Sequence, residues 1–108
     1  MEDKLQKKYC PMTETIFYTL LALLEPNHGY GIMKFVRELT KERVKMGTGT
    51  LYTMLGRLVD DKMITVVSEV DGKKTYQITE EGKALLFMEQ ERLEQQCENG
   101  NRILKGNE

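Results

Sequence analysis

The hydrophobic positions in the first 39 residues predict two packed helices. Residues 15–24 are apolar nearly all round, which is typical of a helix that is buried on most sides. Thr13 stands just ahead of this run, where its hydroxyl can cap the helix. Between residues 30 and 39, apolar residues recur at helical spacing and predict one buried stripe, made of Ile32, Phe35, Val36 and Leu39. Residues 1–10 are polar and form either a frayed arm or a short helix.

A third helix is predicted after a short connector at residues 42–46 and a turn that contains Gly47 and Gly49, with Thr48 or Thr50 as its cap. The residues of this helix that would face a core are Leu51, Leu55, Leu58 and Val59. The opposite face is small, hydroxylated and singly basic, and it holds Thr50, Thr53, Met54 and Arg57. Such a face suits the major groove of DNA. An ordinary amphipathic surface helix has the same periodicity and is the alternative.

A β-hairpin follows this helix. Residues 64–70 and 73–78 are rich in β-branched residues, and they flank Asp71-Gly72, a sequence typical of a type I′ turn. Val44, in the connector, is placed to pair briefly with the hairpin. Lys73 and Lys74 stand at its tip, where they either contact DNA phosphates or belong to a solvated turn. A helix followed by such a hairpin predicts a winged helix-turn-helix with its wing at about residues 64–78.

The chain then continues into a long helix, capped by Thr79, that runs to about residue 99 and can resume after Gly100. Its apolar residues follow a rough heptad seam through Leu86, Leu93, Cys97 and Leu104. The compact domain leaves too little surface to cover this helix, so we expect the same helix of a second subunit to cover it. Packing back onto its own core is the alternative. The expected fold is mainly α with a β-hairpin (α+β), divided into a winged helix-turn-helix at 1–78 and a dimerisation helix at 79–108.

The net charge of −1 is unusual for a protein that binds DNA, but the charge is unevenly distributed. Residues 30–77 hold nine basic and six acidic side chains, a net charge of +3. Residues 78–108 hold four basic and seven acidic side chains, a net charge of −3. The positive segment contains the third helix and the hairpin, which predicts a weak basic patch there.

Several classes of function are not expected. Cys10 and Cys97 lie in no Cys-x-x-Cys pattern and are interpreted as unpaired thiols. The single histidine, His28, is interpreted as a residue that packs or caps at a helix start, and the chain lacks the ligands of a usual zinc site. We therefore expect no metal, no cofactor and no enzymatic activity. No apolar stretch is long enough to cross a bilayer and no signal-peptide pattern opens the chain, which predicts a cytoplasmic protein without a membrane partner.

Three short motifs occur in order along the chain. They are His28-Gly29-Tyr30-Gly31-Ile32, then Gly47-Thr48-Gly49-Thr50-Leu51-Tyr52 with Leu55, Arg57 and Leu58, and last Lys74-Thr75-Tyr76-Gln77-Ile78-Thr79-Glu80-Glu81-Gly82. In order and spacing this set resembles the PadR family of bacterial transcriptional regulators, over about residues 13–88. The short remainder after Gly82 is similar to the branch of the family with a single C-terminal helix.

The resemblance implies a winged-helix homodimer that acts mostly as a repressor on a palindromic operator in double-stranded DNA. It also implies release by a small molecule, often a phenolic or hydrophobic compound. By the resemblance, the residues that meet DNA are Thr48, Thr50, Tyr52 and Thr53 of the third helix, Lys73 and Lys74 of the wing, and Lys8 and Tyr9 of the N-terminal segment. Arg57 joins them by helical phase. Tyr52 has a second interpretation, as a residue that is partly in the core.

The dimer helix implied by the resemblance carries Leu86, Leu93 and Cys97, and the seam adds Leu104. The chain departs from the family in two respects. It has no tryptophan with which to sandwich a planar effector, so Phe87 and Met88 are the candidate lining of an effector pocket, or simply packing residues. It also has Gly56 in the middle of the third helix, where glycine costs about 1 kcal/mol relative to alanine.

The sequence therefore predicts a sequence-specific DNA-binding regulator. The alternative is a winged-helix protein-interaction module that has no sequence-specific DNA binding.

Overall fold

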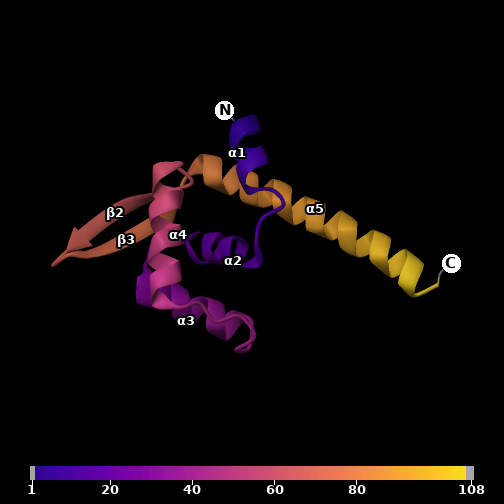
Figure 1. Ribbon diagram of the computed structural model, residues 1–108, viewed down its shortest axis with the longest axis horizontal. Coiled ribbons are helices and arrows are strands. Elements are labelled where there is room, and N and C mark those ends of the chain that lie inside the picture. The colour runs from indigo at the N-terminus through magenta and orange to yellow at the C-terminus, as the bar shows by residue number, and fades with distance from the viewer. Residues whose placement is uncertain (1, 107–108) are drawn as a thin grey trace.

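The computed structural model describes residues 2–106 and contains five helices and three strands within that range. In chain order they are α1 (Glu2–Tyr9), α2 (Glu14–Ala22), β1 (Asn27–His28), α3 (Gly29–Leu39), α4 (Thr48–Asp60), β2 (Ile64–Val70), β3 (Lys73–Ile78) and α5 (Glu80–Leu104). Figure 1 shows α2, α3 and α4 packed together, with the β2–β3 ribbon projecting on one side and α5 running away on the other. The mainly α fold with a hairpin wing is confirmed.

The wing forms as the sequence predicts. Asp71 and Gly72 have φ angles of 53° and 76°, the positive values that a type I′ turn needs at both central residues. β2 pairs with β3 from Ile64–Ile78 to Val70–Lys73, with an irregularity between Val66 and Ser68. A tight turn thus places Lys73 and Lys74 beside the tip of the hairpin.

The third strand of the sheet comes from β1 and not from Val44. Asn27 and His28 pair with Tyr76 and Thr75 of β3, so the strand order is β1-β3-β2. His28 has extended backbone just before α3 begins, which lets it pair along the hairpin edge. Val44 is buried in the hydrophobic core instead, so its predicted pairing with the hairpin was wrong.

The core forms where α2, α3, α4 and the hairpin meet the first turns of α5. Its fully buried apolar residues are Leu20, Leu23, Ile32, Val36, Leu51, Leu55, Leu58, Met63 and Ile64. The stripe of α3 is narrower than predicted, because Phe35 and Leu39 are 39% and 51% exposed. The last turns of α3 extend past α4 (Figure 1), so less of that helix is covered.

Helix ends agree with the predicted caps in two of three cases. The Thr13 hydroxyl accepts a hydrogen bond from the Ile16 amide, and the Thr79 hydroxyl accepts one from the Gly82 amide. The predicted threonine cap of α4 was wrong, because Gly47 occupies that position and α4 has no side-chain cap. α5 continues through Gly100 without a break to Leu104.

Glycine at position 29 is required by close packing of α3 against α4. A side chain there would collide with the hydroxyl of Tyr52. A side chain at Gly31 would likewise collide with the amide group of Asn27, which precedes α3. Glycine in the motif at residues 28–32 therefore serves close packing around the start of α3.

Gly56 is a different case, because nothing lies within 4 Å of a side chain built there. We predict that Gly56→Ala raises the free energy of unfolding by about 1 kcal/mol, since alanine restricts the unfolded chain and favours the helix. Urea denaturation followed by circular dichroism measures the change.

Gly82→Ala is the matched control for Gly56→Ala. Its new methyl group would collide with the Met63 carbonyl oxygen, so the free energy of unfolding should fall by about 1–3 kcal/mol. Equal changes in the two variants would contradict this account of the packing.

Candidate nucleic-acid interface

α4 presents one continuous exposed face. Thr50, Thr53, Gly56 and Arg57 are exposed along it, while Leu51, Leu55 and Leu58 hold the opposite side in the core. Thr48 is exposed at the first position of the helix. Met54, predicted on the outer face, is only 7% exposed and belongs to the hydrophobic core. The face available to a ligand is therefore made of hydroxyls, glycines and one arginine.

The start of α2 lies beside this face and extends it. An open groove runs between the two helices, lined by Thr13, Thr15, Ile16, Gly49, Thr50, Thr53, Met54 and Arg57. The Thr13 and Thr15 hydroxyl oxygens are 3.3 Å apart. They lie at the N-terminal end of α2, where free backbone amides favour negative charge. Sequence reasoning assigned Thr13 only to capping and missed Thr15. Threonine ahead of an apolar helix was the signal that could have found them.

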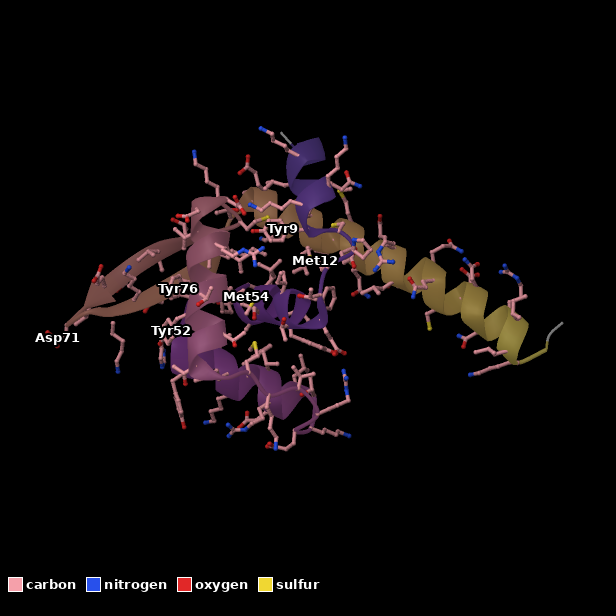
Figure 2. All side chains as sticks on the ribbon, viewed as in Figure 1. Tyr9, Met12, Tyr52, Met54, Asp71 and Tyr76 are labelled. Carbon is pink, nitrogen blue, oxygen red and sulfur yellow. The ribbon has the colours of Figure 1, made fainter. Side chains whose placement is uncertain are left out.

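The wing borders the other side of α4. A shallow notch is lined by Tyr52, Gly72, Lys73, Lys74 and Tyr76, and both lysines are exposed. Figure 2 shows Tyr52, from α4, and Tyr76, from β3, next to each other. Tyr76 is buried, and its pKa is raised by burial and then by the nearby Tyr52 and Glu69. Tyr52 is 49% exposed while its hydroxyl packs at Gly29, so it combines an exposed surface with partial packing in the domain.

The N-terminal residues assigned to DNA contact gather at the other end of α4, around Asp61. Tyr9 is 3% exposed and donates a hydrogen bond from its hydroxyl to the Asp61 carboxylate. Lys8 Nζ lies 2.8 Å from the same carboxylate oxygen. Burial first, and then the hydrogen bond to Asp61, raise the pKa of Tyr9 to about 12. Lys8 is exposed at this site, whereas Tyr9 packs inward and joins α1 to the end of α4.

A buried carboxylate anchors α5. Glu89 is 2% exposed and accepts hydrogen bonds from Arg92 Nε at 2.9 Å and Nη2 at 2.7 Å. It also accepts one from the Met12 amide at 3.0 Å, which ties α5 to the segment between α1 and α2. Arg92 is the main cause that holds the pKa of Glu89 below its ordinary value. The pKa of the Cys10 thiol is raised by burial and by Glu89.

The residues predicted for the dimer helix divide into two groups. Leu86 is 5% exposed because it packs on its own core, and Leu93 is half-buried. Cys97 is exposed and Leu104 is 86% exposed, on the part of α5 that extends beyond the domain. Their contact with a second subunit remains a prediction.

The two candidate effector residues lie apart. Phe87, 64% exposed, borders an apolar pocket of about 160 Å³ between α2 and α5, lined by Phe17, Leu21, Leu24, Leu86, Phe87 and Gln90. Met88 is 40% exposed and is not among these lining residues. The structure therefore associates Phe87 with a pocket and leaves Met88 outside it.

His28 stands at the N-cap position of α3, half-buried, and its side chain makes no capping hydrogen bond. Within residues 2–106, no cluster of three or more histidine, cysteine, aspartate or glutamate side chains could hold a metal ion. None of the helices in this range is both long and apolar enough to cross a membrane.

Residues 18–87 match the model of the transcriptional regulator PadR-like family. The chain belongs to this family. The transcriptional regulator YqjI of Escherichia coli is 31% identical over 70 residues, which are 65% of this chain and 34% of that protein. The chain thus spans about a third of the length of the curated relatives it matches.

Solved structures of transcriptional regulators share the fold. A PadR family regulator from Eggerthella lenta has a TM-score of 0.72 at 22% identity, with 96% of this chain and 88% of that chain covered. A transcriptional regulator from Clostridium thermocellum has a TM-score of 0.71 at 24% identity, with 100% and 98% covered. Bacillus subtilis PadR in complex with operator DNA has a TM-score of 0.57 at 27% identity, with 69% of this chain and 45% of that chain covered.

The Glu89 network predicts a specific loss of stability in acid. A carboxyl group whose pKa is lowered by folding stabilises the protein above its unfolded pKa, about 4.3, and loses that contribution as the pH falls through the folded value. We expect Glu89→Gln to lower the free energy of unfolding by about 2 kcal/mol at pH 7. The difference in the free energy of unfolding between Glu89→Gln and the wild-type protein should become smaller as the pH falls below about 4.

Glu91→Gln is the control, because Glu91 is exposed on the same helix. Urea denaturation at pH 7 and at low pH measures both variants. A Glu89→Gln deficit that stays constant with pH would contradict the role of the ionised carboxylate.

Proposed function

We propose that this PadR-family chain is a DNA-binding transcriptional regulator, with α4 in the major groove and the wing on the flanking phosphates. The observation that carries this proposal is the continuous surface formed by the start of α2, the exposed face of α4 and the wing lysines. Hydroxyls and an arginine can read base edges, and exposed lysines at the hairpin can bind backbone phosphate. The similarity to Bacillus subtilis PadR, solved in complex with operator DNA, supports DNA as the partner.

We further propose that α5 pairs with α5 of a second copy. Beyond Leu93 the described part of this helix is exposed almost throughout, and it presents Cys97, Ile103 and Leu104 to solvent. A two-fold axis through this helix would present two copies of α4 to successive major grooves. The operator would then be palindromic, because each half-site meets the same surface.

Repression released by a small apolar or phenolic molecule is the proposed mode of regulation. The pocket beside Phe87 is lined mainly by apolar side chains, and its volume of about 160 Å³ suits one aromatic ring. Gln90 also lines the pocket, and its side-chain amide can form a hydrogen bond with the hydroxyl group of a phenolic ligand. Since the pocket lies between α2 and α5, an occupant would act where the DNA-binding domain joins the proposed dimer helix.

The deciding experiment is a titration of the full chain against DNA from its own upstream region, with random DNA of equal length as control, at two salt concentrations. Tight, salt-sensitive binding with preference for the upstream DNA supports the regulator. Absence of binding at low salt rejects it and favours the protein-interaction module.

Arg57→Ala is expected to reduce operator affinity by about tenfold to a hundredfold and to reduce the preference over random DNA, because alanine cannot bind a base edge. Lys73→Ala with Lys74→Ala should weaken both DNAs alike and reduce the salt slope, by about 0.9 for each phosphate that is no longer neutralised. Fluorescence anisotropy over a salt series measures both variants. Equal reductions on the two DNAs for Arg57→Ala would contradict its role in base reading.

The dimer proposal predicts that Leu93→Asp shifts the protein from dimer to monomer in analytical ultracentrifugation and weakens operator binding. A charge on the seam of α5 would have to be buried in the dimer, which is costly. Gln95→Asp is the control, because residue 95 lies on the opposite side of the helix from residue 93. Unchanged sedimentation of Leu93→Asp would count against this interface.

A further inference from the structure

Asp61 lies at an unfavourable place for an acid. It is the C-cap residue of α4, and its backbone amide bonds to the Arg57 carbonyl. The C-terminal end of a helix carries partial negative charge, so an aspartate there is destabilising unless cations compensate it. Asp60 adds a second acid at the same end.

The compensation comes from Lys8, Tyr9 and Arg57, and Arg57 belongs to the proposed DNA interface. Lys8 Nζ is 2.8 Å from Asp61 Oδ2, and the Tyr9 hydroxyl donates to the same oxygen. The charge of Arg57 also lies close enough to favour the ionised carboxylate, although less than Lys8 does. Asp61 is thus the carboxylate partner of the Lys8 ammonium group.

The pair is accessible to exchange. The side chain of Lys8 is 49% exposed and that of Asp61 is 21% exposed, so phosphate can approach the ammonium group from solvent. A groove lined by Lys4, Leu5, Lys7, Lys8 and Asp61 opens there. A partly exposed ion pair is weak and can be broken when a phosphate offers a replacement.

We propose that Asp61 is an intramolecular competitor of DNA phosphate that holds Lys8 and thereby limits the affinity for DNA of any sequence. The proposal rests on the DNA-binding function proposed above. Tyr9 supports the arrangement as a positioning residue, because its hydroxyl fixes the Asp61 carboxylate and its buried ring holds α1 against the domain. DNA binding would then exchange one carboxylate partner of Lys8 for a phosphate.

Asp61→Asn tests this, because asparagine keeps an oxygen that can accept the Tyr9 hydrogen bond while its charge is removed. We expect about twofold to fivefold tighter binding to operator and random DNA alike. The salt slope should become steeper by about 0.9, the value for one additional neutralised phosphate. Asp60→Asn is the matched control, since it removes the same charge from the exposed neighbour at the same helix end.

Lys8→Gln completes the test as a double-mutant cycle. If the ion pair with Asp61 keeps Lys8 from binding phosphate, Lys8→Gln lowers the affinity for DNA more in the Asp61→Asn background than in the wild-type background. Asp61→Ser serves as a second variant if Asp61→Asn does not fold, with the same expected direction.

Three results would overturn the proposal: additive effects in the cycle, equal gains for Asp60→Asn and Asp61→Asn, or weaker binding by Asp61→Asn. These outcomes leave the DNA-binding function intact if the wild-type protein still prefers its own upstream DNA. Failure of the wild-type protein to bind any DNA would reject both the function and the competition.

Discussion

The burial of one side of α4 is the constraint on which the candidate interface depends. Leu51, Leu55 and Leu58 are fully buried, so the helix cannot rotate without exposing three large apolar side chains to water. That fixed rotation leaves Thr53 and Arg57 on the outside. The packing is tight on a second side, where Gly29 lets α3 approach the Tyr52 hydroxyl. A DNA-reading surface needs such rigidity, because base contacts require correct placement of short side chains.

Two polar clusters then connect this helix to the rest of the chain. Asp61 joins the end of α4 to α1 through Tyr9 and Lys8. Glu89 joins α5 to the segment that leads from α1 into α2, through the Met12 amide. The N-terminal segment therefore contacts both the proposed DNA-reading helix and the proposed dimer helix. α5 is therefore linked to the region around α4 through the N-terminal segment.

Local sequence signals predicted the elements well where a single short-range interaction decides the structure. The Asp71-Gly72 turn fixes the hairpin, and the hydroxyls of Thr13 and Thr79 fix two helix starts. The predictions failed where distant segments compete for the same contact. Periodicity placed Met54 outside and Phe35 inside, but Met54 packs into the core and Phe35 is 39% exposed on a helix that extends past α4.

The order of the elements, the hairpin turn and the membership of a winged-helix family could all be predicted from the amino-acid sequence, because periodicity, caps and short motifs are local properties. Which polar residues meet depends on how the helices pack. Tyr9 and Asp61 are 52 positions apart along the chain, and Met12 and Glu89 are 77 positions apart. Contacts of this kind leave no periodic signal in one sequence, since they arise only when packing brings separate helices together.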